Sequence, residues 1–287
     1  MTPRNSSSGI RLLLVSLLLC LLTLTLPAQR KLDAKGGLEA FLDTQWWLGL
    51  RAGSNLTNPK TESFYSVLSA IDYDAENLKK NYESFQAPGI QLGLDLTYYH
   101  RGISIGILPT FKRYRYDYDN SLEWITATDI FQTKYQVAQN LDYLEVPLVL
   151  KYDVLKSGNL RPFVQLGIQW GFAIGAEKSL TINHQEGTPA ATSGGTISID
   201  TKKDFKGFAA ALAGIGASFD IGNIRMSLDF SYHYGLTSII EKERLFTENQ
   251  LTAVGDINDD IRLTNLQGNL SFLFPLRFID TTFKSGR

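Results

Sequence analysis

Residues 141–175 read LDYLEVPLVLKYDVLKSGNLRPFVQLGIQWGFAIG. Two segments of this stretch, 143–152 and 162–174, carry apolar side chains at every second position. Successive side chains of a β-strand point to opposite faces, so the pattern predicts two strands with a turn at 153–159 between them. Each strand is roughly 10 residues or longer, the length that a tilted strand needs to cross a bilayer.

Each predicted strand has one apolar face and one polar or small-residue face. The apolar face of the first carries Leu144, Val146, Leu148, Leu150 and Tyr152. The apolar face of the second carries Pro162, Val164, Leu166, Ile168, Trp170, Phe172 and Ile174. The opposite faces include Glu145, Lys151, Gln165 and Gln169. Whether the apolar faces meet a protein core or lipid depends on the rest of the chain.

Residues 1–28 have the features of a secretory signal peptide. Arg4 and Arg11 make the start basic, residues 12–26 are almost all apolar, and Ala28 is a small residue at a plausible cleavage position. The alternative is a membrane-anchoring helix, for which the apolar run is short. We expect cleavage near Ala28 and export from the cytoplasm.

Cys20 is the one cysteine of the 287-residue chain and lies within the predicted signal peptide. A lipoprotein signal at Cys20 is disfavoured because Leu19 occupies the position where a small residue is needed. The mature protein would then have no disulfide and no cysteine-based metal site. The formal net charge is −1, so no large positive field favours nucleic acid as a partner.

Six further segments alternate or are rich in small and apolar residues, which makes eight predicted strands in all. They are 46–56, 87–99, 103–111, 205–219 (in a register that the sequence leaves open), 224–234 and 266–274. Short turns are expected at 100–102, 153–159 and 220–223. Long polar loops are expected at 57–85, with a helical turn near 75–82, and at 114–140, 177–204 and 236–262.

The strict alternation of long and short connections predicts an outer-membrane barrel, whose turns are short on the periplasmic side and long outside. A soluble β-sandwich is the alternative, but long structureless loops count against a compact soluble domain. After residue 28 no apolar run is long enough for a spanning helix, so a membrane-embedded chain must form a closed barrel. We therefore expect an all-β, eight-stranded antiparallel up-and-down transmembrane β-barrel.

Around that barrel the chain divides into four parts. We expect a signal peptide at 1–28, a short periplasmic leader at 29–45, the barrel at 46–276 and a periplasmic C-terminal tail at 277–287. The predicted location is the outer membrane of a Gram-negative bacterium.

Aromatic residues gather near both ends of the predicted strands, as in the two girdles of a membrane barrel. Aromatic residues at the strand ends of a sandwich are the alternative. The predicted girdle consists of Trp46, Trp47, Tyr98, Tyr152, Trp170, Tyr232 and Tyr234.

Faces opposite the apolar ones would line the lumen and form a polar network. Its predicted members are Arg51, Asp95, Glu145, Lys151, Arg225 and Asp229. A lone interior charge is costly, so Arg51 and Arg225 are expected beside Asp95, Asp229 or Glu145. Eight strands leave just enough room for side chains, which favours a filled lumen over a narrow channel.

Motifs of nucleotide-binding, metalloprotease, serine hydrolase or dithiol chemistry are absent from the sequence. Asp229, Ser231 and His233 share one strand face, but same-face neighbours are roughly 7 Å apart, too far for direct hydrogen bonds in sequence. The other histidines are expected in a turn (His100) and in a loop (His184). We therefore predict no catalytic, cofactor or metal residues.

The opening hairpin resembles that of the PorT-like outer-membrane barrel proteins of Bacteroidetes. The similarity lies in Tyr143–Tyr152, YLEVPLVLKY, and in Arg161–Gly167, RPFVQLG, together with the first strand Leu48–Leu56, LGLRAGSNL. It implies an eight-stranded outer-membrane barrel and, through the founding member, an association with type IX secretion. It implies no reaction.

The predicted function is thus a non-enzymatic outer-membrane barrel protein, structural or accessory to secretion or assembly. Expected partners are outer-membrane lipid and proteins that bind its extracellular loops or periplasmic turns. The alternatives are a lipid- or peptide-modifying barrel enzyme, which His233 substitution would inactivate, and a narrow channel.

Overall fold

The computed structural model describes residues 45–65, 79–125, 130–155, 158–186, 191–221, 224–245 and 256–276. The predicted signal peptide, the C-terminal tail and all of the leader except Gln45 lie outside the described residues. Within these ranges the regular elements are antiparallel strands and two short 3-10 helices, η2 (Lys202–Asp204) and η3 (Lys242–Arg244).

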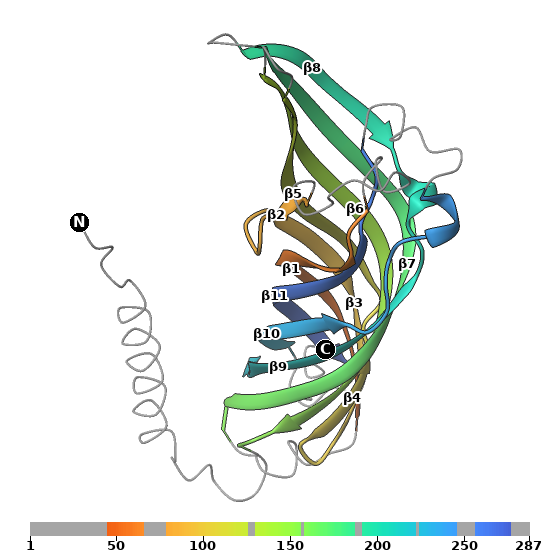
Figure 1. The fold of residues 1–287 in the computed structure, drawn as a ribbon. Coiled ribbons are helices and arrows are strands. Elements are labelled where there is room, and N and C mark those ends of the chain that lie inside the picture. The colour runs from red at the N-terminus through yellow and green to blue at the C-terminus, as the bar shows by residue number, and fades with distance from the viewer. Residues whose placement is uncertain are drawn as a thin grey trace, which may run out of the picture.

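Eight strands close into a ring (Figure 1), which confirms the predicted fold. In ring order they are β1 (Gln45–Ser63), β3 (Pro88–His100), β4 (Ile103–Ile107) continued by β5 (Thr110–Ile125), β6 (Ile130–Asp153), β7 (Leu160–Glu186), β9 (Phe208–Ile221), β10 (Ile224–Gly235) and β11 (Asp260–Pro275). Pairing of β1 with β11 closes the ring. Two shorter strands add to it: β2 (Asn81–Tyr82) pairs with β5, and β8 (Ala191–Asp200) pairs with β7.

The third strand of the ring bends where Leu108 and Pro109 separate β4 from β5. Both parts pair with β3 on one side and β6 on the other, so they act as one barrel strand. Proline has no N–H and cannot donate to a ladder. The backbone continues the pairing around it: the Leu108 N–H donates to the Pro147 carbonyl (3.0 Å), and the Leu94 N–H donates to the Pro109 carbonyl (2.9 Å).

The barrel is apolar outside and polar inside, the reverse of a soluble domain. Leu166 on the outer face of β7 is 61% exposed, whereas Gln165 beside it is 2% exposed. The same inversion holds on β6, where Leu150 is exposed and Lys151 is buried. Outward apolar side chains need lipid to cover them, because exposed apolar surface on this scale is unfavourable in water.

Above the barrel, four strands continue as a curved sheet, which we call the raised sheet (Figure 1). It consists of 113–125 of β5, 130–142 of β6, 175–186 of β7, and β8. The prediction of irregular loops at 114–140 and 177–204 is therefore wrong for most of these residues. His184, which was expected in a loop, lies in β7. β1 also runs on to Ser63, and Asn81–Tyr82 is extended rather than helical.

A β-bulge at Ile174 separates the barrel part of β7 from its raised part. Asp142 pairs with Gly175 and Tyr143 pairs with Ala173, so Ile174 is the extra residue. Below the bulge, even-numbered residues such as Phe172 face outward. Above it they face inward: Lys178 is fully buried. The bulge thus turns an otherwise solvent-facing lysine into the interior.

A hydrophobic core fills the mouth of the barrel under the raised sheet. Its members include Tyr114, Tyr116, Tyr118, Val137, Leu141, Leu180, Phe205, Phe208, Ile239, Ile240, Ile257 and Ile261. Three connecting segments, 201–207, 236–245 and 256–259, supply part of it. The first two are tied together by backbone bonds, from the Lys206 N–H to the Ile239 carbonyl (2.8 Å) and from the Glu241 N–H to the Asp204 carbonyl (2.9 Å).

Candidate functional site

The lumen contains three successive clusters of paired charges. The first lies at the end opposite the raised sheet, where Asp220 accepts hydrogen bonds from both Arg161 and Arg225, the latter at 2.8 Å. The Arg225 guanidinium lies 4.0 Å from the centre of the Trp47 ring. Arg161 is completely buried and also lies 3.5 Å from Asp153. Two aspartates therefore balance two arginines.

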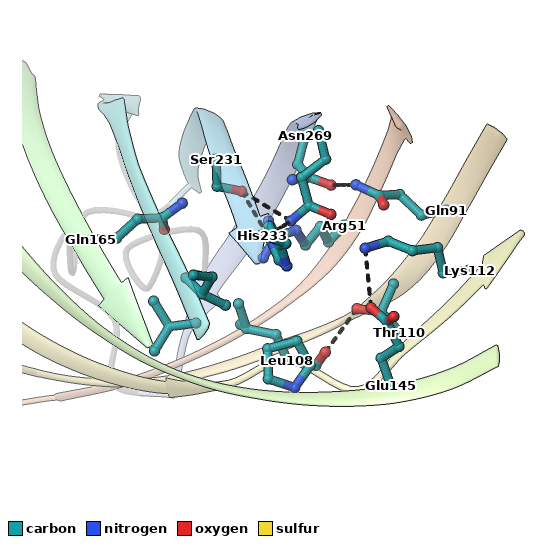
Figure 2. Close-up of a pocket in the computed structure, with 14 residues that line it drawn as sticks. Arg51, Gln91, Leu108, Thr110, Lys112, Glu145, Gln165, Ser231, His233 and Asn269 are labelled. Atoms are coloured by element: carbon teal, nitrogen blue, oxygen red, sulfur yellow. Dashed lines mark hydrogen bonds and ion pairs between the residues drawn. The ribbon is translucent and has the colours of Figure 1, made fainter. Parts of the chain in front are cut away.

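The second cluster occupies the middle of the barrel (Figure 2). Arg51 Nη2 lies 2.8 Å from Asp229, which also accepts hydrogen bonds from Gln165 (3.3 Å) and Asn269 (3.0 Å). Figure 2 shows Lys112 directed at Glu145, at a distance of 3.1 Å. Burying these charges is tolerable because each has an opposite charge and both carboxylates accept further hydrogen bonds.

Little space remains between these side chains. The pocket drawn in Figure 2 has a free volume of about 10 Å³, roughly enough for one water molecule. Side chains of β1, β6 and β10 meet across it. The centre of the barrel is therefore a packed polar core.

The side chains of Ser231 and His233 lie closer together than the spacing of same-face residues on a strand predicts. Ser231 Oγ is 3.0 Å from His233 Nε2, because the long imidazole side chain reaches back along the strand. The expectation that same-face neighbours are too far apart to bond is wrong for this pair. His233 Nδ1 faces the Gln169 side chain (2.6 Å), while Asp229 binds Arg51. Among the described residues, the serine–histidine pair thus has no carboxylate to orient it.

The third cluster holds the segment before β11 against the raised sheet. Lys178 Nζ donates to Asp256 (2.9 Å) and Asn258 (2.5 Å), and the Tyr118 hydroxyl also donates to Asp256 (2.8 Å). All four residues are buried. Burial alone would raise the pKa of Asp256, but the positive charges of Lys178 and Lys80 and the bonds it accepts lower that pKa below its usual value.

A second lysine repeats this arrangement on the other side of the same segment. Lys80 Nζ lies 2.9 Å from Asp259 Oδ1, and the Tyr82 hydroxyl donates to Asp259 Oδ2 at 2.9 Å. The Tyr65 N–H donates to the same carboxylate at 2.8 Å. Two buried lysines therefore fix residues 256–259 across the mouth.

The charged residues predicted to form one lumen network belong to separate ion pairs in the structure. Arg51 pairs with Asp229 as expected. Arg225 instead pairs with Asp220, a residue that was expected in a turn. Lys151 lies 3.5 Å from Asp95. Glu145 pairs with Lys112, which the prediction missed. Lys112 stands at an inward position of a segment that continues a predicted strand, so extending the alternation beyond Phe111 would have found it.

The predicted girdle residues do not all face outward. Trp46 is 47% exposed and its ring centre lies 5.0 Å from that of Tyr98, whereas Trp47 is 1% exposed and lies inside the barrel. Placing Trp47 in the girdle was wrong because adjacent strand residues face opposite ways. The remaining predicted members with outward, exposed side chains are Tyr152, Trp170, Tyr232 and Tyr234.

The part of the chain that the structure describes contains neither a cluster of metal-binding side chains nor a helix able to span a membrane. No group of three or more His, Cys, Asp or Glu side chains there is arranged to hold a metal ion. No helix among the same residues has the length and apolar character needed to cross a membrane.

A closed ring of antiparallel strands with an apolar exterior and a packed polar lumen defines a transmembrane β-barrel protein. The chain belongs to the outer membrane protein beta-barrel domain family, whose sequence model matches residues 44–241. The protein is therefore an outer-membrane barrel of a Gram-negative cell. No curated protein matches the chain.

Solved barrels resemble the structure only distantly. Neisserial surface protein A shares 11% identity over 80% of this chain and 97% of its own, with a TM-score of 0.31. Ail of Yersinia pestis, in complex with the heparin analogue sucrose octasulfate, shares 11% identity over 80% of this chain and 99% of its own, with a TM-score of 0.28. At these TM-scores the fold assignment rests on the strand ring and the family match.

Proposed function

We propose that this chain is a non-enzymatic outer-membrane barrel that serves as a structural or accessory component of secretion or assembly, and that its raised sheet binds a protein partner. The observation that carries the proposal is the contrast between a filled interior and an open sheet edge outside. The lumen offers about 10 Å³ at its centre, and residues 256–259 are fixed over the mouth.

The open edge belongs to β8. Among the described residues β8 pairs with β7 on one side and with no strand on the other. Its side chains at 195–198 are exposed. An unpaired strand edge carries a row of backbone donors and acceptors, and an extended segment of another protein can add to it as a further strand.

A role linked to secretion is the narrower form of the proposal. Its support is the resemblance of the hairpin at 143–152 and 161–167 to the PorT-like proteins. The structure adds that this hairpin forms the barrel halves of β6 and β7, whose continuations form the middle of the raised sheet. A partner at β8 would therefore be one strand away from β7.

Site-specific photo-crosslinking tests the proposal in native outer membranes. A photoreactive amino acid at Thr196 or Ser198 on β8 should yield a discrete adduct, and the same probe at lipid-facing Ile168 is the control. Adducts of the β8 positions that contain secretion components would support the narrower form. Identical bands from all three positions, or none from β8, would contradict partner binding there.

The enzyme alternative rests on Ser231 and His233. Its difficulty is that their bond is buried in the lumen and lacks an orienting carboxylate. Purified protein should leave lipid A and peptide substrates unchanged. Turnover by the wild type that is lost in His233→Ala, while the variant keeps its folded gel mobility, would overturn the non-enzymatic assignment.

A further inference from the structure

Basic and hydroxyl side chains gather on the outer face of the barrel where β1, β10 and β11 reach the level of Tyr232 and Tyr234. Lys60 of β1 is directly opposite Arg262 of β11, and Asn58 is opposite Thr264. Tyr234 of β10 is the other neighbour of Thr264. Directly opposite side chains on one face of a sheet lie about 5 Å apart, so these groups form one patch.

Lys60 supplies an ammonium at girdle level. Its Nζ lies 5.4 Å from the centre of the Tyr234 ring, and both side chains are exposed. Within the described residues no ion pair joins Lys60 to a carboxylate. Long basic side chains at a bilayer edge extend along apolar surface and place their charge among the headgroups.

Two further donors in the patch are buried and have no hydrogen-bond partner among the residues that the structure describes. Arg262 pairs with Glu62, but its Nε is buried and has no hydrogen-bond partner. The Thr264 hydroxyl is also unpartnered, and this residue is 1% exposed. Buried donors normally find acceptors, and the Arg262 side chain as a whole is 34% exposed, so its guanidinium is open to an oxygen-rich group on the outside.

The surface below the patch is apolar. Leu266 on β11, Tyr232 on β10 and Phe230 beside it are exposed to the lipid side. A ligand that fits both parts has an anionic head and hydrocarbon chains. Elsewhere on the rim, Arg113 forms a two-pronged ion pair with Asp142 at 2.6 and 2.7 Å, so its charge is already neutralised.

We propose that Lys60, Arg262 and Tyr234 form a binding site for the phosphate of an anionic lipid in the outer leaflet. The phosphate oxygens would accept from the Lys60 ammonium and the Arg262 guanidinium, with the acyl chains lying along Leu266 and Tyr232. Glu62 competes with the phosphate for Arg262.

The test is lipid retention by native mass spectrometry of the full mature protein released from mixed phosphatidylglycerol and phosphatidylcholine nanodiscs. A basic residue near a lipid surface contributes about a fivefold change in binding, so Lys60→Gln/Arg262→Gln should retain on the order of twentyfold less phosphatidylglycerol. Glu62→Gln should retain more than the wild type. Lys134→Gln, an exposed lysine on the raised sheet, is the matched control and should match the wild type.

The folded gel mobility of each variant shows whether the barrel is intact. If Lys60→Gln/Arg262→Gln does not fold, the single variants Tyr234→Ala and Glu62→Gln still test the site. The first should lower the retention of phosphatidylglycerol and the second should raise it. Unchanged retention in folded variants, an equal loss in Lys134→Gln, or full displacement of the lipid by millimolar inorganic phosphate would overturn the site.

Discussion

Lys178 of β7 and Asp256 of the segment before β11 are joined by a buried 2.9 Å ion pair across 78 residues of sequence. Neither residue belongs to the barrel wall. The bulge at Ile174 turns Lys178 inward, and Tyr118 and Asn258 complete the cluster. This contact connects the raised sheet to residues 256–259, which lie over the mouth of the barrel and which we call the cap.

Removal of that lysine should open the cap. Lys178→Met leaves Asp256 buried without its cation, and breaking a buried pair from one side costs about 3 kcal/mol. Limited proteolysis should cut residues 256–259 faster, and the free energy of unfolding should fall. The double variant Lys178→Met/Asp256→Asn should recover much of the loss. An unchanged cleavage rate in the single variant would contradict the role of this pair.

The cap should also respond to acid through Asp256. Its pKa is lowered in the folded state by Lys178, Lys80 and the bonds it accepts, against the effect of burial. A carboxyl with a depressed folded pKa contributes its stability fully above its unfolded pKa, about 3.9, and loses it as the pH falls through the folded value. Cap proteolysis should therefore stay slow down to about pH 4 and rise below it. Asp256→Asn should flatten this acid response, and an identical pH profile for both proteins would count against the assignment.

Arg51→Ala should lower the melting temperature of the barrel. It leaves Asp229 in the lumen with only Gln165 and Asn269 as donors, at a cost of about 3 kcal/mol. Thermal unfolding followed by heat-modifiable gel migration measures the shift. Lys203→Ala, an exposed lysine in η2, should leave the midpoint in place. Equal midpoints for Arg51→Ala and the wild type would show that the pair adds nothing to stability.

Reconstituted protein should produce no discrete conductance steps in planar bilayers. The lumen is filled by paired charges such as Lys112–Glu145 and Lys151–Asp95, and the mouth is capped. Membranes with inserted protein, verified by antibody detection after recording, should remain at baseline current. Reproducible steps of one size would favour the channel alternative.

The strands of the barrel wall could be predicted because their information is local. Alternation with period two identifies Leu150 as outward and Lys151 as inward without knowledge of any neighbour. The raised sheet was missed because its outer face is polar: Asp117, Gln136 and Thr181 face water, so the alternation loses the contrast that lipid imposes lower on the same strands.

The sequence by itself determined the class of protein: a closed barrel in a membrane, with inward charges that must be paired. The tertiary structure decided which charges meet. Arg225 pairs with Asp220, and Lys178 pairs with Asp256, because strand register, strand tilt and the bulge at Ile174 set the distances between segments far apart in the chain. Which face of the barrel wall a residue occupies is a property of its own strand. Which charges pair across the lumen depends on how all eight strands close, and no single segment encodes that closure.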